Sequence, residues 1–194
     1  AGTSVHSSEF RGHDHIKLDV LPIPAYDLLD MENYFKIVNQ AMAKDLFPEL
    51  HDQIRCLPLM TSRGCAYKCN FCYLGEYSHK WNAKSPKNVL KEMVYLQRKH
   101  KVEEFIILDE NMNCDQVRFQ DLVKVLARHK LKWFAVNGLR ADKLNASILR
   151  AIKASGCKGI VVSQEVADER FRNQVIKKNL PQGAVETVAK ICKK

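Results

Sequence analysis

Short apolar runs alternate with helix patterns through residues 56–194, and this alternation limits the possible folds more than any other feature. We interpret four runs as strands: Leu57–Thr61, Glu104–Asp109, Lys132–Asn137 and Gly159–Glu165. The second, EFIILD, has an unbroken apolar middle, which is typical of a parallel strand buried on both faces. Successive βα units with right-handed crossovers form a parallel sheet. We therefore predict an α/β fold, either an open doubly wound sheet or part of a β/α barrel.

Helix signals fall between these strands, where the crossovers require them. They include a capping serine before a proline, a capping asparagine and a terminating glycine. The predicted helices begin at Ser85-Pro86, cover 115–129, extend from Asn145 to Gly156, and lie near 168–178 and 181–192.

The first 55 residues hold too little apolar surface for a core of their own. Residues 1–15 are rich in serine and histidine, and we expect a tag or a disordered linker there. Residues 16–55 are predicted to be a lead-in, extended at its prolines and then helical near Asn33–Lys44, that packs on another part of the protein. Residues 56–194 would then form the main domain.

Three of the seven cysteines, Cys65, Cys69 and Cys72, are spaced C-x3-C-x2-C. Clustered thiolates select iron–sulfur clusters, zinc or copper(I). A four-iron cluster ordinarily has four cysteine ligands, so three thiolates leave one iron open, and an open metal position is typical of a reactive site. The alternative is structural zinc with His79 or Cys56 as fourth ligand, although no second C-x2-C pair is present.

The total number of cysteines indicates a reducing environment. An odd cysteine count in a chain of this length argues against a secreted disulfide framework. We expect a cytoplasmic protein. The start of the sequence, AGTSVHSSEFRGHDH, has no apolar core region of a signal peptide, and no window approaches the ~18 apolar residues of a membrane helix. The remaining thiols are expected to be small buried apolar groups, at Cys56, Cys114, Cys157 and Cys192.

Positive charge is concentrated in the predicted main domain. Residues 1–55 hold 5 Lys or Arg and 9 Asp or Glu, whereas residues 56–194 hold 26 and 13. A basic domain can meet nucleic acid, nucleotides or an acidic partner. However, the lysines fall mostly on polar faces of the predicted helices, without the basic–aromatic interleaving that binds single strands. A nucleic acid partner is therefore not favoured.

Polar residues lie at the carboxyl ends of all four predicted strands. They are the cysteine loop, Asp109-Glu110-Asn111, Asn137-Gly138-Leu139-Arg140 and Ser163-Gln164-Glu165. In parallel α/β folds, ligands bind at the carboxyl ends of the strands. We therefore predict one ligand site at that edge of the sheet.

The cysteine loop, with Phe71 just before its last cysteine, resembles the signature of the radical S-adenosylmethionine (SAM) superfamily. The phrases LPIPAYDLLDMENYF and PLMTSRGCAYKCNFC, and the segment Leu149–Lys178, are similar to the subgroup with an N-terminal cobalamin-binding domain. The resemblance covers about residues 21–192. It implies a six-stranded parallel β/α barrel, of which this chain would hold about four βα units. We therefore expect a piece of a longer protein, whose cobalamin domain lies outside this chain.

The resemblance also implies a mechanism. A 4Fe–4S cluster on Cys65, Cys69 and Cys72 would receive an electron from a donor such as a flavodoxin or ferredoxin. It would then cleave SAM to a 5′-deoxyadenosyl radical, which abstracts hydrogen from an unknown substrate. The implied cofactor contacts are Phe71 at the adenine, Asp109 and Glu110 at the methionyl amino group, Arg140 at its carboxylate, and Ser163 and Glu165 at the ribose. Two alternatives stay open for the loop tyrosines Tyr67, Tyr73 and Tyr77, which either cover the cluster or only pack.

Three functions follow from this resemblance. The first is a cobalamin-dependent methyltransferase or cyclase. The second is an enzyme similar to the transfer-RNA methylthiotransferases, which the basic charge would suit. The third is a non-catalytic, metal-stabilised half-barrel that binds a partner.

Overall fold

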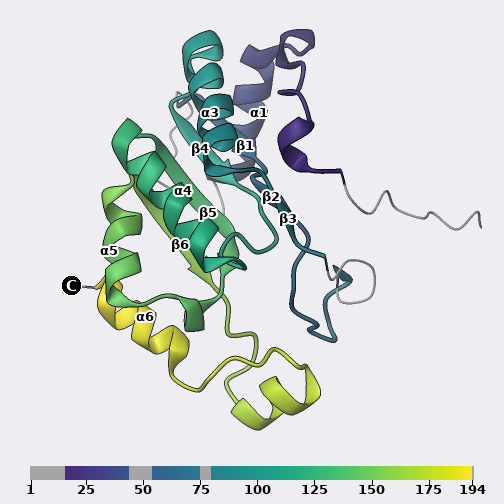
Figure 1. The fold of residues 1–194 in the computed structure, drawn as a ribbon, viewed down its shortest axis with the longest axis vertical. Coiled ribbons are helices and arrows are strands. Elements are labelled where there is room, and N and C mark those ends of the chain that lie inside the picture. Colours follow the sequence, from purple (N-terminus) through teal and green to yellow (C-terminus); the bar gives the residue numbers. More distant parts are fainter. Residues whose placement is uncertain (1–15, 44–53, 75–79, 194) are drawn as a thin grey trace, which may run out of the picture.

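A computed structural model describes residues 16–43, 54–74 and 80–193 (Figure 1). One parallel sheet has the order β1-β4-β5-β6, and β2 pairs with β3 in a separate antiparallel ladder. The predicted α/β fold with a parallel sheet is therefore confirmed. The strands are β1 (Cys56–Leu59), β2 (Ser62–Arg63), β3 (Asn82–Ala83), β4 (Glu104–Ile107), β5 (Lys132–Leu139) and β6 (Cys157–Val162).

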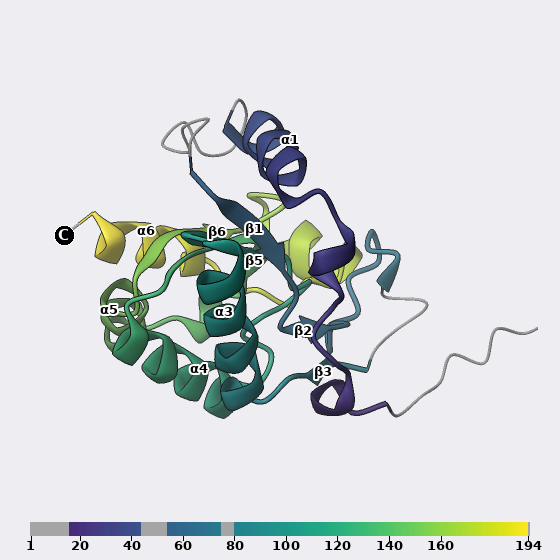
Figure 2. The ribbon, with the colours of Figure 1, turned by 90° about the horizontal axis from the view of Figure 1, so that it is seen from above.

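The crossover helices decide between the two predicted architectures. Helices α3 (Pro86–His100), α4 (Gln116–His129) and α5 (Ala146–Ala154) lie side by side on one face of the sheet (Figure 2). A doubly wound sheet reverses its strand order and has helices on both faces. Here the strand order follows the chain and all three crossover helices share one face. This is the arrangement of part of a β/α barrel.

The helices begin and end where local chemistry predicts. The Ser85 side chain accepts a hydrogen bond from Asn88 N at the start of α3, and the Asn145 side chain accepts from Ile148 N at the start of α5. Asp115 caps α4 in the same way. Such caps satisfy backbone N–H groups that have no partner within the helix.

The core has two sides because alternate strand residues point to opposite faces. Phe105 and Trp133 pack in the large cluster beneath the crossover helices. On the opposite face, Ile106 and Phe134 form a smaller cluster with Val38 of α1 (Met31–Ala43). The lead-in helix therefore packs on the sheet, as expected.

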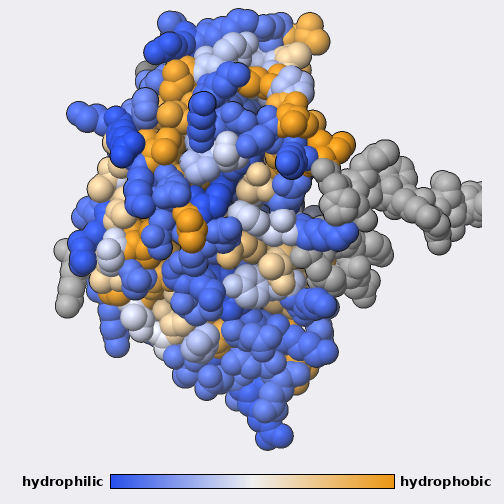
Figure 3. All heavy atoms as spheres, viewed as in Figure 1, coloured by the Kyte–Doolittle hydropathy of each residue, from blue (hydrophilic) through white to orange (hydrophobic). Residues whose placement is uncertain are grey.

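The rest of the lead-in is held by hydrogen bonds to both its side chains and its backbone, and it is partly exposed. It contains two 3₁₀ turns, η1 (Leu18–Val20) and η2 (Tyr26–Leu28), and Asp19 Oδ1 accepts a hydrogen bond from Ser85 N at 2.7 Å. Apolar side chains remain in solvent on this segment, at the upper right of Figure 3. They include Val20, Leu28 and Leu29. The predicted domain boundaries at residues 15 and 55 stay predictions, and residues 1–15 lie outside the described residues.

The chain after β5 differs from several expectations. β6 ends at Val162, so Ser163 and Glu165 follow the strand rather than end it. The segment predicted helical near 168–178 is helical at 169–175, where two α-helical residues lead into a π-helical turn, η4 (Phe171–Val175), and α6 (Ala184–Cys192) begins three residues after Pro181. The physical reason is Arg172, which is 1% exposed. Its guanidinium binds the carbonyls of Val166, Ala167 and Leu180, which holds this segment in an irregular path.

The expectation that the four additional cysteines are all buried is wrong. Cys56 is buried, Cys114 and Cys157 are half-buried, and Cys192 is exposed. Cys192 lies in the last turn of α6, where the helix meets solvent. Within the described residues, no helix has both the length and the apolar character needed to cross a bilayer.

Two glycines test the backbone geometry around α5 and α6. Gly156 (φ +90°) follows α5, and an added Cβ would lie 2.3 Å from Leu131 O, whereas Gly183 (φ +75°) has open space around it. Gly183→Ala should lower the free energy of unfolding by about 1 kcal/mol, because alanine is strained in the left-handed backbone conformation. Gly156→Ala should cost a further ~1–3 kcal/mol because the methyl group overlaps the backbone. Urea unfolding of both variants checks this, and equal losses would contradict the packing at Gly156.

Candidate functional site

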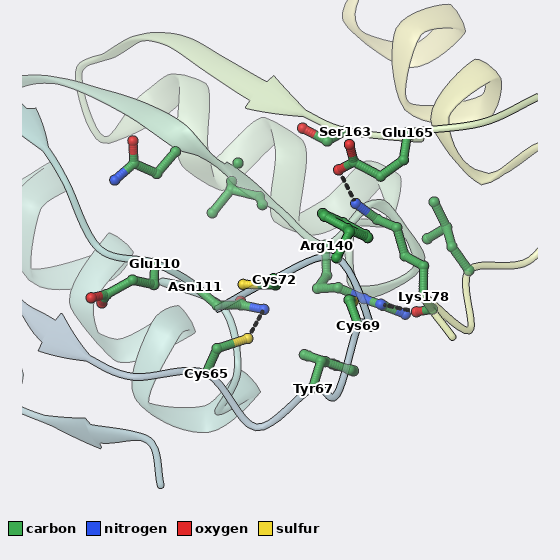
Figure 4. Close-up of a pocket in the computed structure, with 15 residues that line it drawn as sticks. Cys65, Tyr67, Cys69, Cys72, Glu110, Asn111, Arg140, Ser163, Glu165 and Lys178 are labelled. Atoms are coloured by element: carbon green, nitrogen blue, oxygen red, sulfur yellow. Dashed lines mark hydrogen bonds and ion pairs between the residues drawn. The ribbon is translucent and has the colours of Figure 1, made fainter. Parts of the chain in front are cut away.

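The three predicted cysteine ligands line one cavity at the carboxyl ends of the strands (Figure 4). Cys65, Cys69 and Cys72 reach it from the segment between β2 and β3. The other strand ends contribute the opposite walls, so the predicted convergence of strand ends is confirmed. The further lining residues are Tyr67, Phe71, Glu110, Asn111, Asn137, Gly138, Leu139, Arg140, Ser163, Glu165, Lys178 and Leu180.

Asp109 is not among the residues that line this cavity. It is 2% exposed, and its carboxylate accepts hydrogen bonds from Thr61 N and Thr61 Oγ1 at 2.5 Å and from Ser62 Oγ at 2.6 Å. These contacts tie the segment after β4 to the segment after β1. In this structure Asp109 therefore holds the start of the cysteine loop rather than facing a ligand.

Glu110, in contrast, lines the cavity and accepts a hydrogen bond from Gly64 N at 3.2 Å. Phe71 also lines it, although its side chain is 56% exposed. Tyr73 is 70% exposed and is not part of the cavity wall. The structure thus brings Glu110 and Phe71 to the site and leaves Tyr73 outside it.

Arg140 lines the cavity, but its donors are committed to the protein. Its Nε donates to Asp142 Oδ1 at 2.9 Å, and its two terminal nitrogens donate to the carbonyls of Lys178 (2.6 Å) and Asn179 (2.7 Å). The guanidinium also stacks on Tyr67, 4.0 Å from the ring centroid. In this arrangement, Arg140 joins three segments and does not present the two-pronged edge that a bidentate carboxylate contact requires.

The segment after β6 contributes an ion pair to the cavity. Lys178 Nζ lies 2.6 Å from Glu165 Oε1, and both residues line the wall together with Ser163. Glu165 has φ +68°, and such left-handed backbone at a non-glycine residue is uncommon. The surrounding segment therefore holds this carboxylate in a constrained position.

Two residues near the site, Cys114 and Lys178, were missed by sequence reasoning, and Asn111 was expected at this edge of the sheet without a role of its own. Lys178 lies 13 residues beyond Glu165, and no motif spacing indicates their pairing. Cys114 was assigned to the core, yet its thiol shares a hydrogen bond with Cys65. The one signal available was its position just after the polar residues that follow the second strand.

The surroundings favour the thiolate form of Cys65. Its pKa is lowered by the hydrogen bond with Cys114, and further by the backbone of Tyr67, the Asn111 amide and the charge of Arg140, against the opposing effect of burial. Burial instead raises the pKa of Cys69. Because the thiolate is the metal-binding form, Cys65 is better prepared than Cys69 to bind a metal.

The donor set fits a cluster held by three thiolates. The three thiols are spread around one cavity, and iron–sulfur clusters are held by thiolates of this kind. Among the described residues, no three His, Cys, Asp or Glu side chains form a group that could hold one ion. Cys56, considered as a fourth zinc ligand, is buried at the opposite end of β1, and burial raises its pKa to about 12. His79 lies outside the described residues.

These features define a partial β/α barrel with a three-cysteine loop at the carboxyl ends of its strands. The chain belongs to the radical SAM superfamily, whose sequence profile matches residues 59–194. This superfamily uses a 4Fe–4S cluster and SAM.

Among curated relatives, an uncharacterized methyltransferase of Pyrococcus horikoshii is 26% identical over 88% of this chain and 34% of its own length. Cytidylyl-2-hydroxyethylphosphonate methyltransferase of Streptomyces wedmorensis is 27% identical over 84% of this chain and 30% of its own. This chain thus spans about a third of their length. The solved structure of the radical SAM methyltransferase TsrM from Kitasatospora setae, with cobalamin and a [4Fe–4S] cluster bound, has a TM-score of 0.61 at 15% identity and covers 70% of this chain and 28% of that one.

The role of Asp109 can be separated from that of its neighbour Glu110. Asp109→Ala removes three hydrogen bonds to a buried carboxylate, so the free energy of unfolding should fall by on the order of 3 kcal/mol. Glu110→Gln should change it by less than about 1 kcal/mol, because Glu110 accepts a single, longer bond at the cavity wall. Urea unfolding measures both. A stable Asp109→Ala protein would restore Asp109 as a candidate ligand contact.

Proposed function

We propose that this chain is the SAM-binding part of a radical SAM enzyme, with Cys65, Cys69 and Cys72 as the ligands of a 4Fe–4S cluster. The observation that carries the proposal is the shared cavity: three thiols of one loop face the polar ends of three strands. When bound, the cluster and SAM supply a 5′-deoxyadenosyl radical for hydrogen abstraction. The protein supplies binding, orientation and a protected cavity.

The other cavity residues would bind and orient SAM. Glu110 accepts hydrogen bonds and is proposed for the methionyl amino group, and Ser163 and Glu165 for the ribose hydroxyls. We assign the carboxylate contact to Lys178 rather than to Arg140. The ammonium of Lys178 faces the cavity and carries three donors, whereas three donors of Arg140 are already in use.

The aromatic side chains complete the proposed cavity. Phe71 is proposed to contact the adenine, for which its exposed ring is available. Tyr67 lies under the Arg140 guanidinium and would shield the cysteine loop from water. Tyr73 has no proposed contact within this chain because it lies outside the wall.

For the complete protein we propose a cobalamin-dependent methyltransferase, with cobalamin bound by a domain outside this chain. Two curated relatives are methyltransferases, and TsrM is a methyltransferase solved with cobalamin bound. The substrate is not assigned.

A small acidic electron carrier such as a flavodoxin or ferredoxin suits the net charge of +9. A reducing, cytoplasmic location fits the seven free cysteines.

Anaerobic reconstitution with iron and sulfide tests the cluster. The wild-type chain should become brown and bind about four irons. Cys69→Ala should lose the colour and most of the iron while keeping its helix content, because it removes one ligand. Cys157→Ala is the matched control, since this half-buried thiol lies in β6 and not in the cavity, and it should keep the iron. Iron retained by Cys69→Ala would show that the ligands are assigned wrongly.

Cleavage of SAM tests the reaction. Reduced, reconstituted protein, with its flanking domains present, should release 5′-deoxyadenosine from SAM. Lys178→Met should weaken SAM binding by about tenfold, as expected for the loss of one charge-assisted contact. Lys177→Met is the control, because the side chain of Lys177, next to Lys178 in the sequence, is exposed and is not part of the cavity wall. A colourless protein with stoichiometric zinc that ignores SAM would refute the proposed function.

A further inference from the structure

We propose that Asn111 is a positioning residue that donates an N–H hydrogen bond to the thiolate of Cys65 and thereby raises the reduction potential of the bound cluster. This inference rests on the proposed function, because it requires a cluster on Cys65. It assigns a role to a side chain that is neither a metal ligand nor one of the proposed SAM contacts.

The position of Asn111 supports this role. The residue is 5% exposed, lines the cavity, and its Nδ2 lies 3.7 Å from Cys65 Sγ (Figure 4). Its backbone carbonyl accepts a hydrogen bond from Trp81 Nε1 at 3.0 Å, and two residues before it the Asp109 carboxylate anchors the same segment. The amide therefore reaches the sulfur from a rigid support, as a precise functional contact requires.

The other end of the amide indicates what orients it. Asn111 Oδ1 is buried and has no hydrogen-bond partner among the described residues. A buried polar atom without a partner is destabilising by about 1–3 kcal/mol, and such exceptions require an explanation. The Cys65 sulfur is the side-chain partner of the amide in this structure, so the contact with sulfur accounts for the orientation.

Ligation fixes the direction of this hydrogen bond. A free thiol can donate its own proton, but a metal-bound thiolate has none and can only accept. With the cluster in place, the amide must present Nδ2 to the sulfur, as it does here. The bond then becomes charge-assisted and therefore stronger than a bond between neutral groups.

Among the described residues, a side-chain N–H donor reaches the sulfur of Cys65 but not the sulfur of Cys69 or Cys72. Hydrogen bonds to the sulfurs are one of the factors that set cluster potentials. The reduced cluster carries one more negative charge, so a donor stabilises it more than the oxidised form. The Cys65 corner should therefore contribute most to making the cluster reducible.

Potentiometric titration of the reconstituted protein, followed by electron paramagnetic resonance of the reduced cluster, tests this role. Asn111→Leu keeps the shape of the side chain but removes the donor. We expect full iron content and a reduction equilibrium about tenfold less favourable, which corresponds to about 59 mV more negative for one electron. Asn111→Asp adds a negative charge and should lower the potential further.

The control is Asn137→Leu. This amide lines the same cavity but donates to Leu108 O at 2.8 Å, so the potential should not change. A wild-type potential in Asn111→Leu with full iron content would overturn the inference and leave the proposed function intact. If the Leu variant takes up no iron, the Asp variant decides: a potential at or above that of the wild type would overturn the inference.

A second measurement needs no variant. In wild-type protein carrying ¹⁵N in its asparagine side chains, pulsed electron paramagnetic resonance should detect a nitrogen coupled to the reduced cluster. No coupling would overturn the inference. A wild-type protein that forms no cluster would instead refute the proposed function, and this inference with it.

Discussion

The buried carboxylate of Asp109 is the contact on which the position of the cysteine loop depends. It joins the ends of β1 and β4 through Thr61 and Ser62, immediately before the three ligands begin. A buried charge is tolerated only where hydrogen bonds replace its lost hydration. The direction of the chain at Thr61 and Ser62 is therefore fixed by the sheet. The cysteine loop, which follows directly, begins from a defined position.

Buried arginines have the corresponding role on the opposite wall. Arg172 binds three backbone carbonyls of the irregular segment after β6, and Arg140 binds two more at residues 178 and 179. Asn113 fixes Arg140 in turn by a reciprocal pair of hydrogen bonds with its backbone. A wall without regular secondary structure is thus held by a few ionic groups, each of which satisfies several carbonyls. This arrangement brings Glu165 and Lys178 to the cavity.

The sequence predicted the elements well and the orientation of single side chains poorly. The helix caps at Ser85 and Asn145 and the four parallel strands follow from local chemistry and periodicity. Asp109 and Glu110 show the limit. Both were expected to contact SAM, but neighbouring residues in extended chain point to opposite sides, and only Glu110 lines the cavity. The sequence alone cannot say which of two adjacent carboxylates faces the ligand.

The sequence by itself determined the βα order and the three cysteines at the end of the first strand, because both are encoded in spacings of a few residues. Only the tertiary structure placed Cys114 against Cys65, turned the Asn111 amide towards the same sulfur and committed Arg140 to carbonyls. These contacts join residues that are 38 or more positions apart in the sequence, and the partners of Arg140 are backbone groups. Every residue offers a backbone carbonyl, so no sequence pattern marks the one that a distant side chain will bind.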